Sequence, residues 1–114
     1  MHRKIFIFLT ISLALAGCVD IDSVVIKTPD FQQKPDGVYR GDYTLGPVKV
    51  VLEVTLRSGT IDSINLIQHR KGFGKKAEVV LDRVLAQQTL DVDYVSGATG
   101  SSKALLKAIE LALD

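Results

Sequence analysis

This sequence has almost no cysteine or tryptophan, and neither sign of charge is in excess. Its 114 residues include 1 cysteine and 0 tryptophans, and the formal net charge is +1. A single cysteine excludes an internal disulfide framework and a thiolate metal cluster, and no group of histidine and acidic residues has the spacing of metal ligands. The near-neutral charge excludes a nucleic-acid binder that depends on bulk positive charge. With 46% hydrophobic and 24% charged residues, the composition is that of one small globular domain.

Long apolar runs are absent except near the start of the chain. Residues 5–16 are almost entirely apolar and follow the basic residues Arg3 and Lys4. This run is shorter than the roughly 20 apolar residues that span a bilayer. Its length and its basic flank are those of a secretory signal.

The residues around the lone cysteine resemble the lipobox of bacterial lipoproteins. The small residues Ala16 and Gly17 directly precede Cys18. The resemblance implies that residues 1–17 are removed as a signal peptide and that Cys18 is diacylated as the mature N-terminus. It also implies a location on the extracytoplasmic side of the cell membrane, in a periplasm or at the cell exterior. The alternative is an ordinary secretory signal in which Cys18 is incidental.

The next segment, residues 18–35, is expected to be a flexible tether. It is mostly polar, it contains Pro29 and Pro35, and it has few large apolar groups, which is typical of linkers. The folded domain is expected to span residues 36–114.

Three segments with the alternation of β-strands open this domain, at residues 37–44, 48–57 and 60–68. The second is rich in β-branched residues, and Ser58-Gly59 after it is typical of a two-residue hairpin turn. These features predict three antiparallel strands in a meander.

Two helical segments follow the strands. Apolar residues recur at helical spacing over residues 77–85, and residues 101–113 carry a second apolar stripe. Residues 90–95 between them look short and extended. Strands followed by helices indicate an α+β fold, with a small antiparallel sheet of three to four strands and two helices packed on one face.

The segment before the second helix is rich in glycine and hydroxyl groups. Residues 96–102 read Ser-Gly-Ala-Thr-Gly-Ser-Ser. Free backbone N–H groups and the helix dipole make such a place suited to an anion, and Thr99, Ser101 and Ser102 can add hydroxyl donors. The alternative is a simple helix cap, because Ser and Thr are preferred there.

The order Asp93-x-x-Ser96-Gly97-Ala98-Thr99 resembles the flavin-attachment motif of the FMN-binding domain family. That domain occurs in flavin-bearing subunits of the sodium-pumping NADH:quinone oxidoreductase and of Rnf-type complexes, and in small extracytoplasmic lipoproteins. The resemblance implies FMN joined covalently to Thr99 through a phosphoester bond, which a flavin transferase adds using FAD and Mg²⁺. It further implies that Asp93 is the acidic position that the transferase requires, and that Ser96, Gly97 and Ala98 form the turn.

The resemblance extends over residues 36–114. Further elements occur in the order of the family: Asp36-Gly37-Val38-Tyr39-Arg40-Gly41, the Ser58-Gly59 hairpin, His69, and Gln88-x-Leu90-Asp91-Val92-Asp93. Residues 70–74 depart from it, because they lack the acidic Glu-Thr-Pro-Gly character of many members. The chain resembles the stand-alone form of the domain, without the membrane-spanning helix of the large subunits.

Several other residues are candidates for contact with a flavin. His69 can approach the ring or carry a proton, or it can be an exposed side chain at a strand end. Phe73 and Tyr94 can lie against the ring, or Phe73 can pack on the sheet. Four basic residues can stabilise a reduced flavin or its phosphate, or can be solvated: Arg70, Lys71, Lys75 and Lys76.

These observations favour a membrane-anchored electron carrier with covalent FMN, which passes electrons between membrane redox partners. The chain has little beyond the flavin domain for a substrate pocket, so we expect no catalytic residue and no self-sufficient enzyme. A second hypothesis is an accessory or sensory flavin-binding subunit of a membrane redox complex. A third is a structural lipoprotein whose Ser-Gly-Ala-Thr turn only caps a helix.

Overall fold

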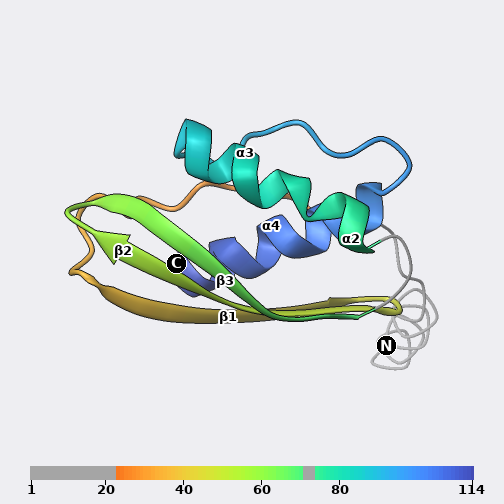
Figure 1. The fold of residues 1–114 in the computed structure, drawn as a ribbon, viewed down its shortest axis with the longest axis horizontal. Coiled ribbons are helices and arrows are strands. Elements are labelled where there is room, and N and C mark those ends of the chain that lie inside the picture. Colours follow the sequence, from red (N-terminus) through yellow and green to blue (C-terminus); the bar gives the residue numbers. More distant parts are fainter. Residues whose placement is uncertain (1–22, 71–73) are drawn as a thin grey trace, which may run out of the picture.

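The computed structural model describes residues 23–70 and 74–114. The expected signal peptide, Cys18, Lys71 and Phe73 lie outside these residues. The described chain forms the strands β1 (Gly37–Leu45), β2 (Val48–Arg57) and β3 (Thr60–Arg70), followed by the helices α2 (Gly74–Ala77), α3 (Val79–Gln87) and α4 (Thr99–Leu113) (Figure 1).

The strands form one antiparallel sheet in the order β1-β2-β3, as the alternation predicts. β2 lies in the centre and pairs with both neighbours, because its β-branched residues suit a half-buried pleated surface. Ser58 and Gly59 have φ values of 54° and 74°, as a type I′ hairpin turn requires. The Asp36 carboxylate accepts a hydrogen bond of 2.8 Å from the Ser58 N–H, so the residue before β1 stabilises the turn between β2 and β3.

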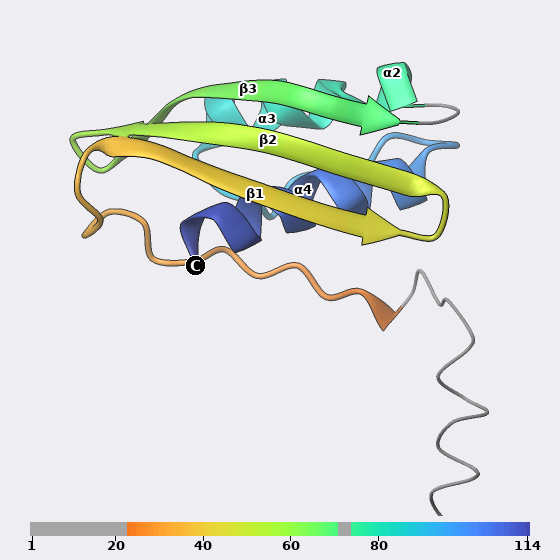
Figure 2. The same ribbon diagram turned by 90° about the horizontal axis from the view of Figure 1, so that it is seen from below.

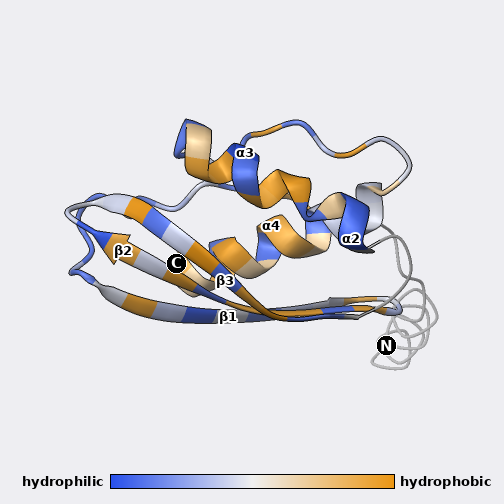
Figure 3. Cartoon of the chain, viewed as in Figure 1, coloured by the Kyte–Doolittle hydropathy of each residue, from blue (hydrophilic) through white to orange (hydrophobic). Residues whose placement is uncertain are grey.

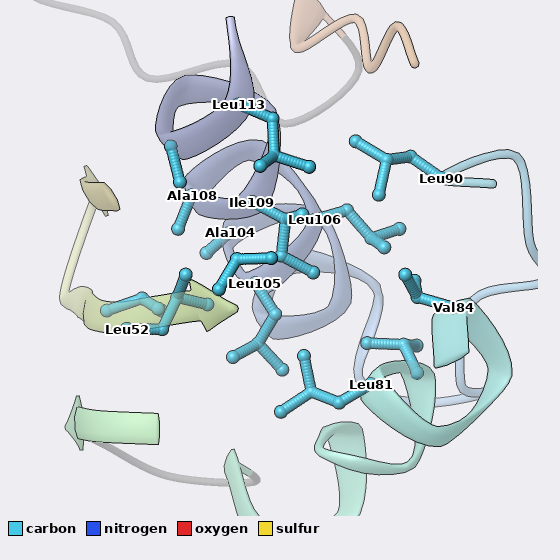
Figure 4. Close-up of a cluster of buried hydrophobic side chains, with 14 of the residues drawn as sticks. Leu52, Leu81, Val84, Leu90, Ala104, Leu105, Leu106, Ala108, Ile109 and Leu113 are labelled. Carbon is cyan, nitrogen blue, oxygen red and sulfur yellow. The ribbon is translucent and has the colours of Figure 1, made fainter. Parts of the chain in front are cut away.

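Helices α3 and α4 cover the same face of this sheet (Figures 1 and 2). Both helices and the sheet carry apolar residues (orange in Figure 3), and many of these belong to one hydrophobic core. Figure 4 shows Leu105 and Ile109 of α4 between Leu52 of β2 and Val84 of α3, and all four side chains are fully buried. The predicted α+β arrangement, with two helices on one face, is confirmed. The short helix α2 precedes α3 and was not expected as a separate element.

Residues 90–95 are extended but do not join the sheet, which has three strands rather than four in the described part of the chain. They lead from the end of α3 to the start of α4 (Figure 1). Leu90 and Val92 are buried in the core, and Arg83 Nη1 of α3 donates a hydrogen bond of 2.7 Å to the Asp93 carbonyl. The arginine side chain thus supplies the hydrogen bond to this carbonyl that a neighbouring strand would supply in a sheet.

Residues 24–31, here called the strap, pack against the domain instead of forming a loose tether. Phe31 is only 4% exposed and belongs to the hydrophobic core. Val24 and Ile26 pack against the same core from its edge. The folded unit therefore begins before residue 36, because a few apolar side chains in this polar segment find places in the core.

Hydrogen bonds to α4 fix the strap along that helix. The Lys27 N–H donates to Glu110 Oε1 at 3.0 Å, and Lys107 Nζ donates to the Val25 carbonyl at 3.1 Å. Side chains of α4 thus satisfy backbone groups of an irregular segment, which is the general requirement for packing such a segment onto a domain.

Candidate functional site

The Ser-Gly-Ala-Thr segment forms a tight turn that leads directly into α4. The Ala98 N–H donates to the Val95 carbonyl at 2.9 Å, and Gly97 has a φ of 81°. These are the features of a type II turn, whose third position needs the left-handed conformation that glycine adopts freely. The Ser102 N–H then donates to the Ala98 carbonyl at 2.9 Å, and this is the first hydrogen bond of α4.

Thr99 is the first residue of α4 and is exposed. Ser96 and Gly97 beside it are exposed as well, whereas Ala98 is 4% exposed and lies in the core. The buried Ala98 side chain packs the turn against the core, while the residues on either side of it remain exposed to solvent. Thr99 is therefore accessible from the solvent.

The N-terminal end of α4 has no anionic or side-chain cap. Its first turn contains no acidic residue, and the side chain of the N-cap residue Ala98 makes no capping hydrogen bond. The first N–H groups of a helix have no intrahelical acceptor, and the helix dipole adds partial positive charge at this end. Alanine is a poor N-cap, so the Ser or Thr side-chain cap considered from sequence is not found at the N-cap position of α4.

The two serines that follow Thr99 face the interior. Ser101 is 7% exposed and Ser102 is fully buried. The Ser102 Oγ accepts a hydrogen bond of 3.1 Å from the Val95 N–H. Of the hydroxyl groups considered as anion ligands, this one ties the turn to the helix.

A lysine from α2 reaches the same turn. α2 contacts α4 and lies beside its first turn (Figure 1). The Lys76 Nζ lies 3.7 Å from the position that a Cβ on Gly97 would occupy. In the sequence, Lys76 lies in a basic segment about 20 residues before the turn, and no local pattern indicates that the two meet.

Asp93 and Tyr94 lie at the surface, just before the turn. Asp93 is exposed, and the bond from Arg83 to its backbone carbonyl fixes the chain there. Tyr94 is 40% exposed, and the Lys103 Nζ stands 5.7 Å from the centre of its ring, which is a cation–π distance. Both residues are therefore at the surface, in the segment that leads to Thr99.

His69 is buried, unlike the exposed histidine that sequence analysis considered as the alternative to flavin contact. Its side chain is 2% exposed, and its Nδ1 lies 3.2 Å from Glu78 Oε2. The Nε2 atom is buried and has no hydrogen-bond partner among residues 23–70 and 74–114. Glu78, at the junction of α2 and α3, therefore orients the imidazole ring.

Neither a membrane span nor a metal site is found in the part of the chain that the structure describes. No helix there is long and apolar enough to cross a membrane. No three histidine, cysteine or acidic side chains in these residues are grouped so that they could bind a metal ion.

Comparison with known proteins connects this fold and this turn to a family. The model of the FMN-binding domain matches residues 45–114. A urocanate reductase of Eggerthella lenta is 36% identical over 106 residues, which cover 90% of this chain and 18% of that protein. An uncharacterized protein of Treponema pallidum is 32% identical over 82 residues, 69% of this chain and 23% of that protein. The chain thus corresponds to about a fifth of the length of these two relatives, and no solved structure matches significantly.

The matched region contains β2, β3, the helices and the whole turn from Val95 to Thr99. It therefore includes both the core of the fold and the exposed threonine. The chain belongs to the FMN-binding domain family.

Proposed function

We propose that this protein is an electron-transfer flavoprotein that carries FMN covalently on Thr99 through a phosphoester bond. The observation that carries the proposal is the exposed Thr99 at a helix end with no acidic residue and no side-chain cap. Membership of the FMN-binding domain family supports the identity of the cofactor. Similarity to a protein named urocanate reductase agrees with a redox role.

The residues around Thr99 fit a phosphodiester. The N–H groups of the first turn and the helix dipole favour negative charge at this point, and the Lys76 ammonium group lies near the turn. Asp93 is at the surface, where a flavin transferase that uses FAD and Mg²⁺ can recognise it. A covalent bond suits a site outside the cytoplasm, because a cofactor bound only by mass action is lost when its free concentration falls.

When bound, the flavin supplies transfer of one or two electrons. A phosphoester bond leaves the ring system chemically unmodified, so its reduction potential depends on the protein groups around it. The proposed role is therefore exchange of electrons with partner proteins or membrane redox carriers, without a substrate site on this chain.

A lipid anchor at Cys18 is the proposed attachment to the membrane. The course of the strap along α4 indicates which end of the domain would lie near that anchor. Val25 contacts Lys107 and Lys27 contacts Glu110, so the strap runs alongside α4 in the same direction. Its N-terminal end therefore lies toward the end of α4 that bears Thr99 (Figure 2). An anchor at Cys18 would keep the flavin end of the domain close to the membrane and to redox partners there.

The test is co-expression of the full chain with a flavin transferase, followed by intact-mass measurement. The unaltered chain should gain the mass of one FMN phosphoester and should fluoresce after denaturing electrophoresis. Thr99→Ala should gain no flavin, and Thr99→Ser should retain some, because the nucleophilic oxygen survives. Ser101→Ala is the control and should be modified normally. Full modification of Thr99→Ala would show that the acceptor is another residue.

Two further measurements test the location and the role. Cys18→Ser should abolish lipid attachment and move the protein out of the membrane fraction. The flavin of the unaltered chain should be reduced and reoxidised reversibly in membranes that contain its partners. Flavin that stays in one redox state during respiration would favour the accessory or sensory role instead.

A further inference from the structure

We propose that Lys76 is the phosphate-binding residue of this domain, whose ammonium group pairs with the phosphodiester on Thr99. This inference rests on the proposed function and extends it, because it names a second residue that receives the flavin phosphate. The residue comes from α2, which the sequence does not connect with the Ser-Gly-Ala-Thr motif.

The first support is position. Lys76 Nζ lies 3.7 Å from the place of a Cβ on Gly97, and Gly97 stands two positions before Thr99 in the same turn. Glycine has no side chain there, so the ammonium group lies beside exposed backbone. A lysine side chain has four rotatable bonds and can follow a group attached to a neighbouring residue.

The second support is that Lys76 has no anionic partner. It is exposed, and none of the ion pairs among the described residues includes it. The neighbouring end of α4 offers no carboxylate, because its first turn has no acidic residue. An ammonium group and a positive helix end therefore lie close together, and no ion pair among the described residues neutralises Lys76. A phosphodiester on Thr99 would supply one negative charge at that place.

The role follows from the attachment reaction. The Thr99 Oγ bonds to the FMN phosphorus of FAD, the phosphoanhydride P–O bond to the AMP part breaks, and AMP leaves with the electron pair. The hydroxyl proton passes to a base of the transferase. The Lys76 ammonium group balances negative charge on the phosphoryl oxygens, both during transfer and in the product.

The experiment uses full-length chain purified without flavin in detergent, then mixed with transferase, FAD and Mg²⁺. Four chains are compared: the unaltered chain, Lys76→Gln, Lys76→Arg and Lys75→Gln. Lys75→Gln is the matched control, because Lys75 is the adjacent exposed residue of α2 and loses the same charge. The readouts are the initial rate of FMN mass gain and the thermal midpoint of each chain before and after attachment.

Lys76→Gln should slow attachment about two- to fivefold, the scale of one ion pair at an exposed site. Lys76→Arg should recover most of the rate, and Lys75→Gln should match the unaltered chain. The flavin-free midpoints should be equal, but the rise in midpoint on attachment should be smaller for Lys76→Gln. The rate difference should shrink as salt is raised, since screening weakens a charge effect but not a structural one.

Equal rates and equal midpoint rises for Lys76→Gln and Lys75→Gln would overturn the role of Lys76 and leave the attachment at Thr99 standing. A reduced flavin-free midpoint in Lys76→Gln, with no salt dependence of its rate, would also overturn it in favour of a structural role. Absence of FMN mass gain in the unaltered chain would refute the proposed function itself, and the inference with it.

Discussion

Among single residues, Gly41 determines how closely the sheet approaches α4. A Cβ on Gly41 would overlap the backbone carbonyl oxygen of Ala108 and would stand 2.9 Å from the Ala112 Cβ. Neither atom belongs to a flexible side chain, so glycine alone fits at this contact. The last glycine of the opening motif at residues 36–41 is therefore explained by packing between strand and helix.

We predict that Gly41→Ala lowers the free energy of unfolding by about 3 kcal/mol, because the backbone of α4 must move to admit a methyl group. Gly37→Ala is the control, since a Cβ there meets only the Tyr39 side chain, at 3.7 Å or more. It should change stability by less than about 0.5 kcal/mol. Urea denaturation of both variants measures the difference, and equal stability would show that the helix moves freely at this contact.

Among the elements, α4 and the turn before it behave as one unit. The turn is closed by the bond from Ala98 to Val95, and the Ser102 hydroxyl of α4 binds the N–H of that same Val95. Thr99 lies between these two connections. Its position on the surface therefore depends on a buried side chain one helical turn further on.

We predict that Ser102→Ala lowers the free energy of unfolding by about 1–2 kcal/mol, because a partly buried N–H loses its acceptor. It should also slow flavin attachment, since the turn that presents Thr99 loses its tie to the helix. Ser96→Ala removes an exposed hydroxyl of the same turn and should leave stability within about 0.5 kcal/mol. Chemical denaturation and the rate of FMN mass gain check both effects, and identical behaviour of the two serine variants would contradict the structural role of Ser102.

For the whole molecule, the strap makes the domain larger than its strands and helices. Phe31 lies in the core, and Thr28 Oγ1 accepts a hydrogen bond of 3.0 Å from the Leu90 N–H. The strap thus contacts both α4 and the segment that leads to the Thr99 turn. A lipid anchor attached to such a segment would orient the domain, whereas an anchor on a loose tether would not.

We predict that Phe31→Ala costs about 3–5 kcal/mol of stability, as expected when a buried aromatic side chain leaves a cavity. Val25→Ala is the control within the strap, because Val25 is 60% exposed and its hydrogen bond to Lys107 uses the backbone carbonyl. Thermal and urea denaturation of the two variants measure the strap's contribution. Unchanged stability in Phe31→Ala would mean that residues 24–31 are a tether after all.

The sequence by itself determined the parts of this protein that depend on local pattern. Alternation along residues 37–44, 48–57 and 60–68 and the Ser58-Gly59 pair predicted the sheet, since side-chain period and turn residues are local properties. The apolar stripe of residues 101–113 predicted the helix that fills the core. The order of residues from Asp93 to Thr99 indicated the family and the threonine that we propose as acceptor.

Only the tertiary structure decided which distant groups meet. The buried His69 side chain meets Glu78, which lies in another element, and Lys76 reaches Gly97 because α2 packs beside α4. The strap is ordered because α4 offers Lys107 and Glu110 to its backbone. Such contacts join a side chain to backbone or charge far along the chain, and they leave no periodic signal in the sequence for a local pattern to show.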